Sequence, residues 1–243
     1  DQGGKSWFFL TADYAFGQAL EADTSKVVKE KGGTVVGSVR HPLNASDFSS
    51  FLLQAQASKA KVIGICNAGT DTVNTIKQAA EFGIVKGGQK LAGLLLTLAE
   101  VHGLGLEAAQ GLVLTEGYYW DRDDKSRDLA NRFFKRTGRM PNMIQAGCYA
   151  GTLHYLKAVN ALGAGADADG AAVVAQMKAM QTQDIAFGTG TIRADGRALF
   201  PAYLLQARAP GAITGKWDLL DVAATTPAAE AWRPVSEGGC PLV

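Results

Sequence analysis

Residues 6–39 read SWFFLTADYAFGQALEADTSKVVKEKGGTVVGSV and contain a complete strand–helix–strand unit. The apolar run Ser6–Leu10 predicts a strand, and the β-branched run Thr34–Val39 predicts a second one. Residues 17–31 between them predict a helix, and two glycines end it. A helix between two strands at this spacing is typical of a parallel βαβ unit.

The same alternation continues to about residue 116. Further strands are predicted at residues 61–66, 91–96 and 112–115, with helices at 48–55 and 73–83. These strands are continuous apolar runs, which favours a sheet covered by helices on both faces. The sequence therefore predicts an α/β fold with a doubly wound parallel sheet.

The pattern changes after residue 118. Three helices are predicted at residues 130–137, 149–159 and 173–180, and Asp169 is placed to cap the third. No strand is predicted between them. We therefore expect these helices to lack a sheet of their own within this chain.

The last part of the chain predicts strands again. Asp195-Gly196 indicates a hairpin between strands at residues 190–193 and 198–208. Pro201 marks the second of these as an edge strand or a bulge. A final strand is expected at residues 217–222.

Composition and charge exclude several classes of function. The 243 residues carry 24 Lys+Arg and 23 Asp+Glu, a formal net charge of +1. Nucleic-acid binding, which needs a basic surface, is therefore not expected. The longest nearly apolar run, Leu91–Ala99, is much shorter than the ~20 residues of a membrane-spanning helix. The chain opens on DQGGK and not on a signal peptide, so we expect a processed start or a missing front portion.

The three cysteines, Cys66, Cys148 and Cys240, are far apart and lack the spacing of a zinc or redox motif. At most one internal disulfide is possible. The pattern favours two buried thiols, at Cys66 and Cys148, and one cysteine near the C-terminus.

In a doubly wound sheet, ligands bind beyond the carboxyl ends of the strands, where the strand order switches. Three such ends can be read, at residues 11–17, 67–71 and 95–97. Tyr14 and Phe16 offer two aromatic rings there, whose alternative role is packing in the core under the first helix. Gly69 would let a ligand approach the amides that start the next helix, which attract anions such as carboxylates. Asp71 is expected to cap that helix.

Enzyme motifs do not fit. Residues 103–108 match G-x-G-x-x-A but do not follow the first strand, so a dinucleotide site is not expected. His41, His102 and His154 lack metal-ligand spacing, and His154 is expected in a solvated or capping role. The acidic cluster 121–124 is expected to be a solvated loop between lobes and not a cation site. We therefore expect no catalytic residues, no metal and no cofactor.

The stretch Phe9–Gln18, FLTADYAFGQ, resembles the start of the second lobe in type I periplasmic binding proteins. It is most similar to the branched-chain amino acid (Leu/Ile/Val) binding family of ABC transporters. The similarity continues, in order, at Asn67–Asp71, Ile76–Gly83, Gly105–Gly111, Ile192–Arg197 and Cys240–Val243.

This resemblance implies two α/β lobes joined by three crossovers, a small solute trapped between the lobes, and docking on a membrane permease. Residues 1–118 would form the complete second lobe. Residues 119–190 would be helices of the incomplete first lobe, and residues 191–243 the crossover hairpin and C-terminal segment. The family's N-terminal portion, with the first lobe's strands, has no counterpart here.

The resemblance also implies a set of ligand-binding residues. Phe16 matches an aromatic position that packs on the solute, and Tyr14 lies beside it. Ala68 and Gly69 match a position at the pocket wall, and Gln145 would face the cleft from the first lobe. The complete candidate set is Thr11, Tyr14, Phe16, Asn67, Ala68, Gly69, Leu94, Leu95 and Gln145.

Leu94 or Leu95 falls where amino-acid binders of this family place an acidic residue for the ammonium group of the solute. Leucine cannot pair with an ammonium, and an unpaired buried charge is costly. We therefore expect a carboxylate solute without an ammonium group, such as an aromatic or short aliphatic acid. A branched-chain amino-acid-like solute stays within the wider family expectation.

The function predicted from the sequence is therefore that of an extracytoplasmic solute-binding component of an ABC importer, periplasmic or lipoprotein-anchored. The family's first-lobe anchors for the solute carboxylate are not in this sequence, so we expect weak or no solute binding by this chain alone. We also expect dimerisation or swapping through exposed apolar surface. The alternative is a ligand-sensing regulatory or receptor domain of the same fold. A flavodoxin-like reductase is a third alternative, but this sequence lacks the phosphate-binding loop that such an enzyme needs at the end of the first strand.

Overall fold

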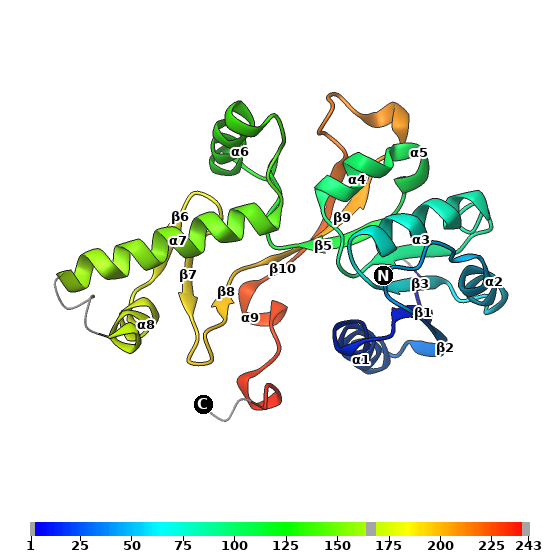
Figure 1. Ribbon diagram of the computed structural model, residues 1–243, viewed down its shortest axis with the longest axis horizontal. Coiled ribbons are helices and arrows are strands. Elements are labelled where there is room, and N and C mark those ends of the chain that lie inside the picture. The colour runs from blue at the N-terminus through cyan, green and yellow to red at the C-terminus, as the bar shows by residue number, and fades with distance from the viewer. Residues whose placement is uncertain (1–2, 164–168, 240–243) are drawn as a thin grey trace. The chain divides into compact units, whose positions relative to one another are not determined.

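The computed structural model describes residues 3–163 and 169–239 of the chain (Figure 1). The chain divides into two compact units. Unit 1 comprises Asp1–Thr115 and Leu205–Asp221, and unit 2 comprises Glu116–Leu204 and Val222–Val243. The chain therefore passes between the units three times.

Unit 1 contains the strand–helix alternation that the sequence predicts. Its elements are β1 (Ser6–Ala12), α1 (Ala15–Glu30), β2 (Thr34–His41), α2 (Ser49–Ala57), β3 (Val62–Cys66), α3 (Thr70–Glu81), β4 (Lys90–Gly93), α4 (Leu98–Leu104), α5 (Leu106–Ala109) and β5 (Val113–Glu116). Strands β1 to β4 pair in parallel with their neighbours, and β4 pairs in parallel with β5. The predicted α/β fold with a parallel sheet is confirmed.

The sheet is wider than the sequence predicts. Its order is β10-β9-β5-β4-β3-β1-β2, so β9 (Ala202–Ala207) and β10 (Leu220–Thr226) continue it beyond β5. A 3-10 turn, η2 (Pro210–Ala212), lies between these two strands in the sequence. The pairing of β9 with β5 has no local sequence signal, because it joins segments about ninety residues apart.

The strand order reverses between β1 and β3. From β1 the chain moves outward to β2 and then returns to β3 on the other side. Because parallel crossovers are right-handed, α1 and α2 lie on opposite faces of the sheet. Helix α2 contacts α3 and α3 contacts α4 and α5, which places this group together on the face opposite α1. The point of reversal is where ligands bind in such sheets.

The core of unit 1 is the centre of this sheet. All five residues of β3 are buried, and Phe9, Leu10, Ile63 and Ile65 are fully enclosed. Burial on both faces explains why the strand reads as a continuous apolar run.

The start of α1 packs directly on the ends of β1 and β3. A Cβ atom at Gly17 would collide with the carbonyl oxygen of Ala12 and lie 2.9 Å from that of Cys66. Both obstacles are backbone atoms of the sheet and cannot rotate away. Only glycine fits at this position without moving the helix.

Unit 2 contains the three predicted late helices and a small sheet. Its elements are α6 (Asp124–Thr137), α7 (Met143–Leu162), α8 (Gly170–Ala179), β6 (Thr182–Asp184), β7 (Gly188–Ile192), β8 (Ala198–Leu199), α9 (Ala228–Ala231) and η3 (Val235–Glu237). Asp169 caps α8 by accepting a hydrogen bond from the Ala171 N–H, as predicted. Strands β6, β7 and β8 form an antiparallel sheet of three strands, with β7 in the middle.

Several details of the sequence interpretation were wrong. The late helices do have strands beside them, because α7 contacts β6 and α8 contacts β7. The strand predicted at residues 198–208 is two strands in different sheets, interrupted at Pro201, which has no N–H to donate. The last strand begins at Leu220 and not at residue 217.

The cysteine prediction is half right. Cys66 is buried, whereas Cys148 is exposed on α7. Cys240 lies outside the described residues. None of the helices that the structure describes is long and apolar enough to cross a membrane.

The close packing at Gly17 gives a stability test. We expect Gly17→Ala to lower the free energy of unfolding by about 1–3 kcal/mol, since overpacking against rigid backbone outweighs the better helix propensity of alanine. Gly103→Ala, on α4, is the matched control because its new Cβ meets nothing within 4 Å. Urea unfolding followed by circular dichroism measures both. Equal stability of the two variants would contradict the packing described for α1.

Candidate functional site

The strand ends at the switch point of unit 1 bring several predicted residues to one edge of the sheet. Thr11 pairs in register with Cys66, and Ile65 pairs with Gly93. The residues that follow β3 and β4, Asn67 and Leu94, therefore lie at the same edge as Thr11. Eight of the nine candidate residues belong to these three neighbouring strand ends.

Two half-buried aromatic rings lie at the junction of β1 and α1, Tyr14 on the loop and Phe16 in the first turn of the helix. Tyr14 directly precedes α1 with an extended backbone, and its ring lies 5.8 Å from that of Phe16. The Asp13 N–H donates to the carbonyl of His41, 2.9 Å away, which ties the loop to the end of β2. Thr11 is fully buried and its hydroxyl donates to Glu21 at 2.6 Å. This end of β1 thus offers the two rings, while the Thr11 side chain is engaged with Glu21.

Asn67 is fully buried in a polar network below the β3–α3 loop. Its amide nitrogen lies 3.1 Å from Nε2 of His41 and donates to the Thr75 hydroxyl at 3.2 Å. Its amide oxygen accepts from the Thr72 hydroxyl at 2.7 Å. His41 Nδ1 faces the Pro42 carbonyl at 2.9 Å, so Nδ1 carries the proton and Nε2 accepts from Asn67. The Asn67 side chain is therefore fully used in positioning its loop.

Gly69 is the N-cap residue of α3, and its φ of 60° suits glycine. The prediction that Asp71 caps this helix was wrong. Asp71 lies inside the first turn, and its carboxylate accepts a hydrogen bond from the Asn44 N–H at 3.1 Å. Gly69 is exposed and Ala68 is half-buried, so the backbone at the start of α3 faces open space at this edge.

The β4–α4 loop presents apolar side chains. Leu94 and Leu95 are both half-buried, directly after the last residue of β4. Thr97 caps α4 in a capping box with Glu100, whose carboxylate accepts from the Thr97 N–H at 2.9 Å. The acidic residue nearest in sequence is thus engaged in holding the helix start.

Gln145 belongs to unit 2, whereas the other eight candidates belong to unit 1. It is exposed on the first turn of α7, and its side-chain oxygen accepts from the Asn142 N–H at 2.9 Å. Together with Asn142 it forms the capping box that starts α7. The structure gives Gln145 this capping role, and its role toward a solute stays a prediction.

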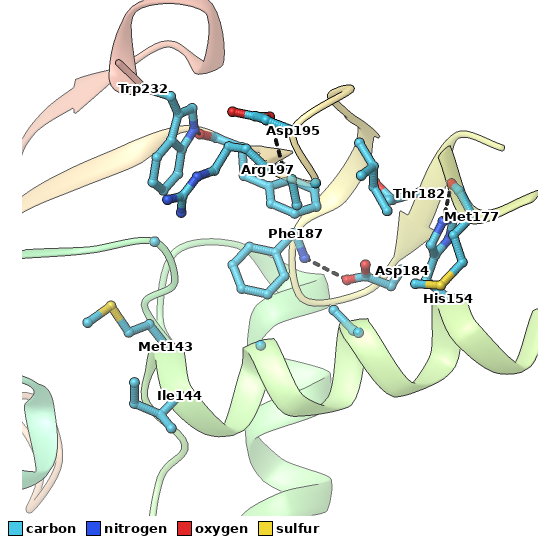
Figure 2. Close-up of a pocket in the computed structure, with 18 residues that line it drawn as sticks. Met143, Ile144, His154, Met177, Thr182, Asp184, Phe187, Asp195, Arg197 and Trp232 are labelled. Carbon is cyan, nitrogen blue, oxygen red and sulfur yellow. Dashed lines mark hydrogen bonds between the residues drawn. The ribbon is translucent and has the colours of Figure 1, made fainter. Parts of the chain in front are cut away.

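Unit 2 has a groove that sequence reasoning missed. Its volume is about 570 Å³, and we call it the α7 groove. One face of α7 forms one side, and the β6–β8 segment with Trp232 forms the other (Figure 2). Phe187 and Phe200 stack in its wall with their ring centroids 4.7 Å apart.

His154 lines this groove and is buried, so the solvated role predicted for it was wrong. Its Nε2 donates to the carbonyl of Met177 at 2.8 Å, in the last turn of α8. His154 thus caps the C-terminal end of α8, which is the other role predicted for it. The helical periodicity of α7 around Ala150 and Ala158, both buried, was the signal that could have shown burial of His154 on the same face.

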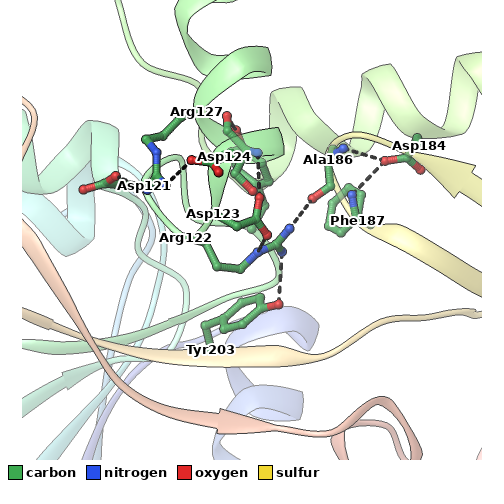
Figure 3. A network of polar contacts seen from close by, with 11 residues as sticks. Asp121, Arg122, Asp123, Asp124, Arg127, Asp184, Ala186, Phe187 and Tyr203 are labelled. Carbon is green, nitrogen blue, oxygen red and sulfur yellow. Dashed lines mark hydrogen bonds and ion pairs between the residues drawn. The ribbon is translucent and has the colours of Figure 1, made fainter.

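A second missed feature is the Arg122 network, which joins three segments of unit 2 (Figure 3). Arg122 donates to Asp123 at 2.8 Å, to the Tyr203 hydroxyl at 3.0 Å and to the Ala186 carbonyl at 3.0 Å. Asp123 in turn accepts from the Ser126 N–H and caps α6. Burial opposes ionisation of Asp123, but the hydrogen bonds from Ser126 and Arg122 lower its pKa below the ordinary value.

This network accounts for most of the predicted acidic cluster. Asp121 and Asp124 both pair with Arg127, at 2.9 Å and 2.7 Å. Among the described residues, no group of His, Cys, Asp or Glu is arranged to hold a metal ion. The acidic residues therefore fix the start of α6 and the segment that enters unit 2.

The comparison with protein families decides the identity. The profile of the family described as periplasmic binding protein matches residues 1–212. The chain belongs to the periplasmic binding protein family. None of the curated proteins compared with the chain matches it.

Solved structures agree with this family. A periplasmic binding protein from Burkholderia mallei is 52% identical with a TM-score of 0.92, and the match covers 99% of this chain and 63% of that one. A branched chain amino acid ABC transporter periplasmic ligand-binding protein from Burkholderia xenovorans is 39% identical with a TM-score of 0.88, covering 99% and 64%. A solute binding protein of an ABC transporter from Rhodopseudomonas palustris is 25% identical with a TM-score of 0.79, covering 93% and 61%. This periplasmic binding protein chain thus spans less than two thirds of the length of these relatives.

The buried thiol beside Asn67 gives a chemical test of the strand end. Burial raises the pKa of Cys66 to about 12. We expect Cys66 to resist a thiol reagent at pH 8 until the protein unfolds, while Cys148 reacts at once. A Cys240→Ser variant makes the count unambiguous, and intact mass after timed labelling measures it.

The raised pKa of Cys66 also makes the free energy of unfolding depend on pH. An unfolded thiol ionises near pH 8.5, and only the unfolded state releases this proton below about pH 12. The stability contributed by the neutral thiol is therefore present below pH 8.5 and is lost as the pH rises above it. Cys66→Ala should reduce the decline in stability above pH 8.5, and Cys148→Ser should not. Identical pH profiles for both variants would refute the burial of Cys66.

The Arg122 network predicts unequal effects of two arginine substitutions. Arg122→Ala should lower the free energy of unfolding by about 2 kcal/mol, since it removes the donor to the Ala186 carbonyl and to Oδ2 of Asp123. Arg132→Ala is the matched control. Its ion pair with Asp128 is exposed at 3.7 Å and should contribute less than about 0.5 kcal/mol. Urea unfolding measures both, and a loss at Arg122 no larger than at Arg132 would contradict the network.

Proposed function

We propose that this chain is the solute-binding part of an ABC importer and contacts a small carboxylate through the switch-point edge of unit 1. The observation that carries the proposal is the convergence of three strand ends at this edge, with two half-buried rings, an open helix start and two leucines. Helix starts favour anions, and the rings and leucines favour an apolar body. The family membership of the chain supports solute binding in general.

The solute class follows from the β4–α4 loop. Leu94 and Leu95 offer no carboxylate, so a solute ammonium group would stay unpaired there. An aromatic or aliphatic acid without an ammonium group fits this edge better than an α-amino acid. The Rhodopseudomonas palustris relative was solved in complex with 3,4-dihydroxy benzoic acid, which supports an aromatic acid. The Burkholderia xenovorans relative is named for branched chain amino acids, which keeps an amino-acid-like solute as the competing assignment.

The proposed binding residues are Thr11, Tyr14, Phe16, Asn67, Ala68, Gly69, Leu94, Leu95 and Gln145. Within this set, Tyr14, Phe16 and the leucines would contact the solute. Thr11 and Asn67 would act by holding their loops, since their side chains are engaged in internal hydrogen bonds.

The proposal extends to the whole protein. Residues 1–118, joined by residues 205–221 of the C-terminal segment, would serve as one lobe. Residues 119–190 would supply helices of the other lobe, and residues 191–243 the crossover hairpin and C-terminal segment. The partner is an ABC permease, and the location is periplasmic or extracytoplasmic with a lipid anchor. The relatives named as ABC transporter proteins support this assignment. Without the remaining part of a lobe, the chain alone would bind solute weakly and would associate as a dimer or swapped assembly.

The solute proposal is tested on a chimaera in which this chain is joined to the part of the Burkholderia mallei relative that it does not match. Calorimetry would compare 3,4-dihydroxybenzoate, 4-methyl-2-oxopentanoate and leucine. We expect at least one of the two acids to bind at least tenfold more tightly than leucine, and the unfused chain to bind at least tenfold more weakly than the chimaera.

Leu94→Asp or Leu95→Asp should shift this preference toward leucine, because the new carboxylate can pair with an ammonium group. Leu53→Asp, at an exposed position of α2, is the control and should change neither affinity. Tight binding of leucine, with no heat of binding for either acid, would contradict the proposal.

A further inference from the structure

Four lysines gather at the edge of the unit 1 sheet where β1 and β3 begin, which we call the amino-end edge. Lys5 precedes β1, and Lys31 follows α1. Lys59 and Lys61 precede β3. All four are exposed. Among the residues that the structure describes, none of their ammonium groups forms a hydrogen bond or an ion pair.

The sheet brings two of these lysines to adjacent strands. Trp7 of β1 pairs in register with Val62 of β3, so Lys5 and Lys61 lie at the starts of neighbouring parallel strands. The Lys61 N–H donates to the Ser6 hydroxyl at 3.0 Å, which ties the two starts together. The positive charge is therefore concentrated at this edge.

A hollow of about 640 Å³ lies beside Lys5 and Lys31, which both line it. Trp7 and Val27 supply apolar surface there, and Val27 is 53% exposed. The indole N–H of Trp7 donates to the Gly4 carbonyl at 2.7 Å, so the polar end of this half-buried ring is satisfied within the chain. The hollow thus combines two cations with an apolar wall.

A second hollow, of about 230 Å³, lies beside the other two lysines. Lys59 and Lys61 line it together with residues 87–89. In the part of the chain that the structure describes, no acidic side chain lines either hollow. Glu30, which is next to Lys31 in the sequence, pairs instead with Lys26 at 3.9 Å. The four lysines therefore have no neighbouring carboxylate in these hollows to neutralise them.

The carboxyl ends of the strands carry a different balance of charge. Arg40, at the end of β2, pairs with Asp13 at 3.3 Å. Asp71 and Glu100 follow β3 and β4, and both accept hydrogen bonds from backbone N–H groups. A formal net charge of +1 for the whole chain thus conceals unpaired cations at one edge of unit 1. Such a patch attracts an anionic partner.

We propose that the amino-end edge of unit 1 binds an anionic phospholipid surface. The four lysines contact headgroup phosphates, and the hollow at Trp7 and Val27 meets the boundary between headgroups and acyl chains. Tryptophan and lysine suit this boundary because each joins an apolar body to a polar tip.

The apolar wall favours a lipid over a nucleic acid or another soluble polyanion, which offers phosphates without acyl chains. The proposal rests on the proposed extracytoplasmic location only for the choice of a membrane as the anionic surface. The two ends of parallel strands lie at opposite edges of a sheet, so a membrane at the amino-end edge leaves the switch-point edge open to the solute.

The test measures co-sedimentation of the 243-residue chain with lipid vesicles. One set contains phosphatidylcholine alone, and the other contains phosphatidylcholine and phosphatidylglycerol in equal amounts. We expect at least tenfold stronger binding to the vesicles with phosphatidylglycerol. Raising the salt from about 0.1 M to about 1 M, which shortens the Debye length from about 10 Å to about 3 Å, should remove this preference.

Two variants separate the lysines from net charge. Lys31→Glu/Lys61→Glu should weaken binding to the anionic vesicles at least tenfold, and both side chains are exposed and unpaired, so the fold should persist. Lys125→Glu/Lys135→Glu is the matched control, because it changes the net charge equally at two exposed positions of α6 in unit 2. This control should change binding less than threefold.

The apolar contribution has its own variant and readout. Val27→Ser keeps every charge and should weaken binding at least threefold, since it removes apolar surface from the hollow. Hydrogen exchange with anionic vesicles should be slower in residues 27–33 and 57–61 and unchanged in residues 13–18 and 68–73.

Four results would overturn the proposal. They are equal binding to both kinds of vesicle, wild-type binding by Lys31→Glu/Lys61→Glu, full binding by Val27→Ser, and binding of heparin through the same lysines without binding to vesicles. The last result assigns the edge to a soluble polyanion. None of them bears on solute binding, which calorimetry on the chimaera measures without vesicles.

Discussion

The contact between the start of α1 and the ends of β1 and β3 is the constraint on which the rest of unit 1 depends. Gly17 sits against two backbone carbonyls of the sheet, so the helix can begin only where it does. This places Tyr14 directly before α1 and Phe16 in its first turn, and the Asp13 N–H ties the loop to His41, which contacts Asn67. The switch-point edge is therefore a rigid surface, whose shape is set by backbone packing and by buried hydrogen bonds.

The sequence was sufficient for this part of the fold because its signals are local. The strand Val62–Cys66 is apolar throughout because both faces are covered, and residues 6–39 carry a full βαβ unit in one continuous stretch. The edge of the sheet follows from strand order, so Thr11, Asn67 and Leu94 could be placed together from the pattern alone. The sequence did not predict which partner each side chain contacts at this edge. Asn67 and Thr11 turn inward to His41 and Glu21, and such partners depend on tertiary contacts between distant residues.

Unit 2 was harder to predict because its contacts are made between separated segments. The break of residues 198–208 into two strands depends on Pro201 and on which sheet each half joins. Arg122 donates hydrogen bonds to Ala186 and Tyr203, and no spacing in the sequence predicts those contacts. The buried face of α7 that holds His154 is indicated by its i, i+4 pattern, but the hydrogen bond from His154 to Met177 of α8 depends on tertiary packing. These are the places where the crossing segments are held and where the α7 groove opens.

The central claim is that the edge formed by β1, β3 and β4 contacts the solute. Hydrogen exchange on the chimaera, with and without a saturating aromatic acid that it binds, tests this claim most directly. We expect slower exchange in residues 13–18 and 68–73, where the amides at the starts of α1 and α3 would meet the solute. Protection confined to other segments, with these two loops unchanged at saturation, would contradict it.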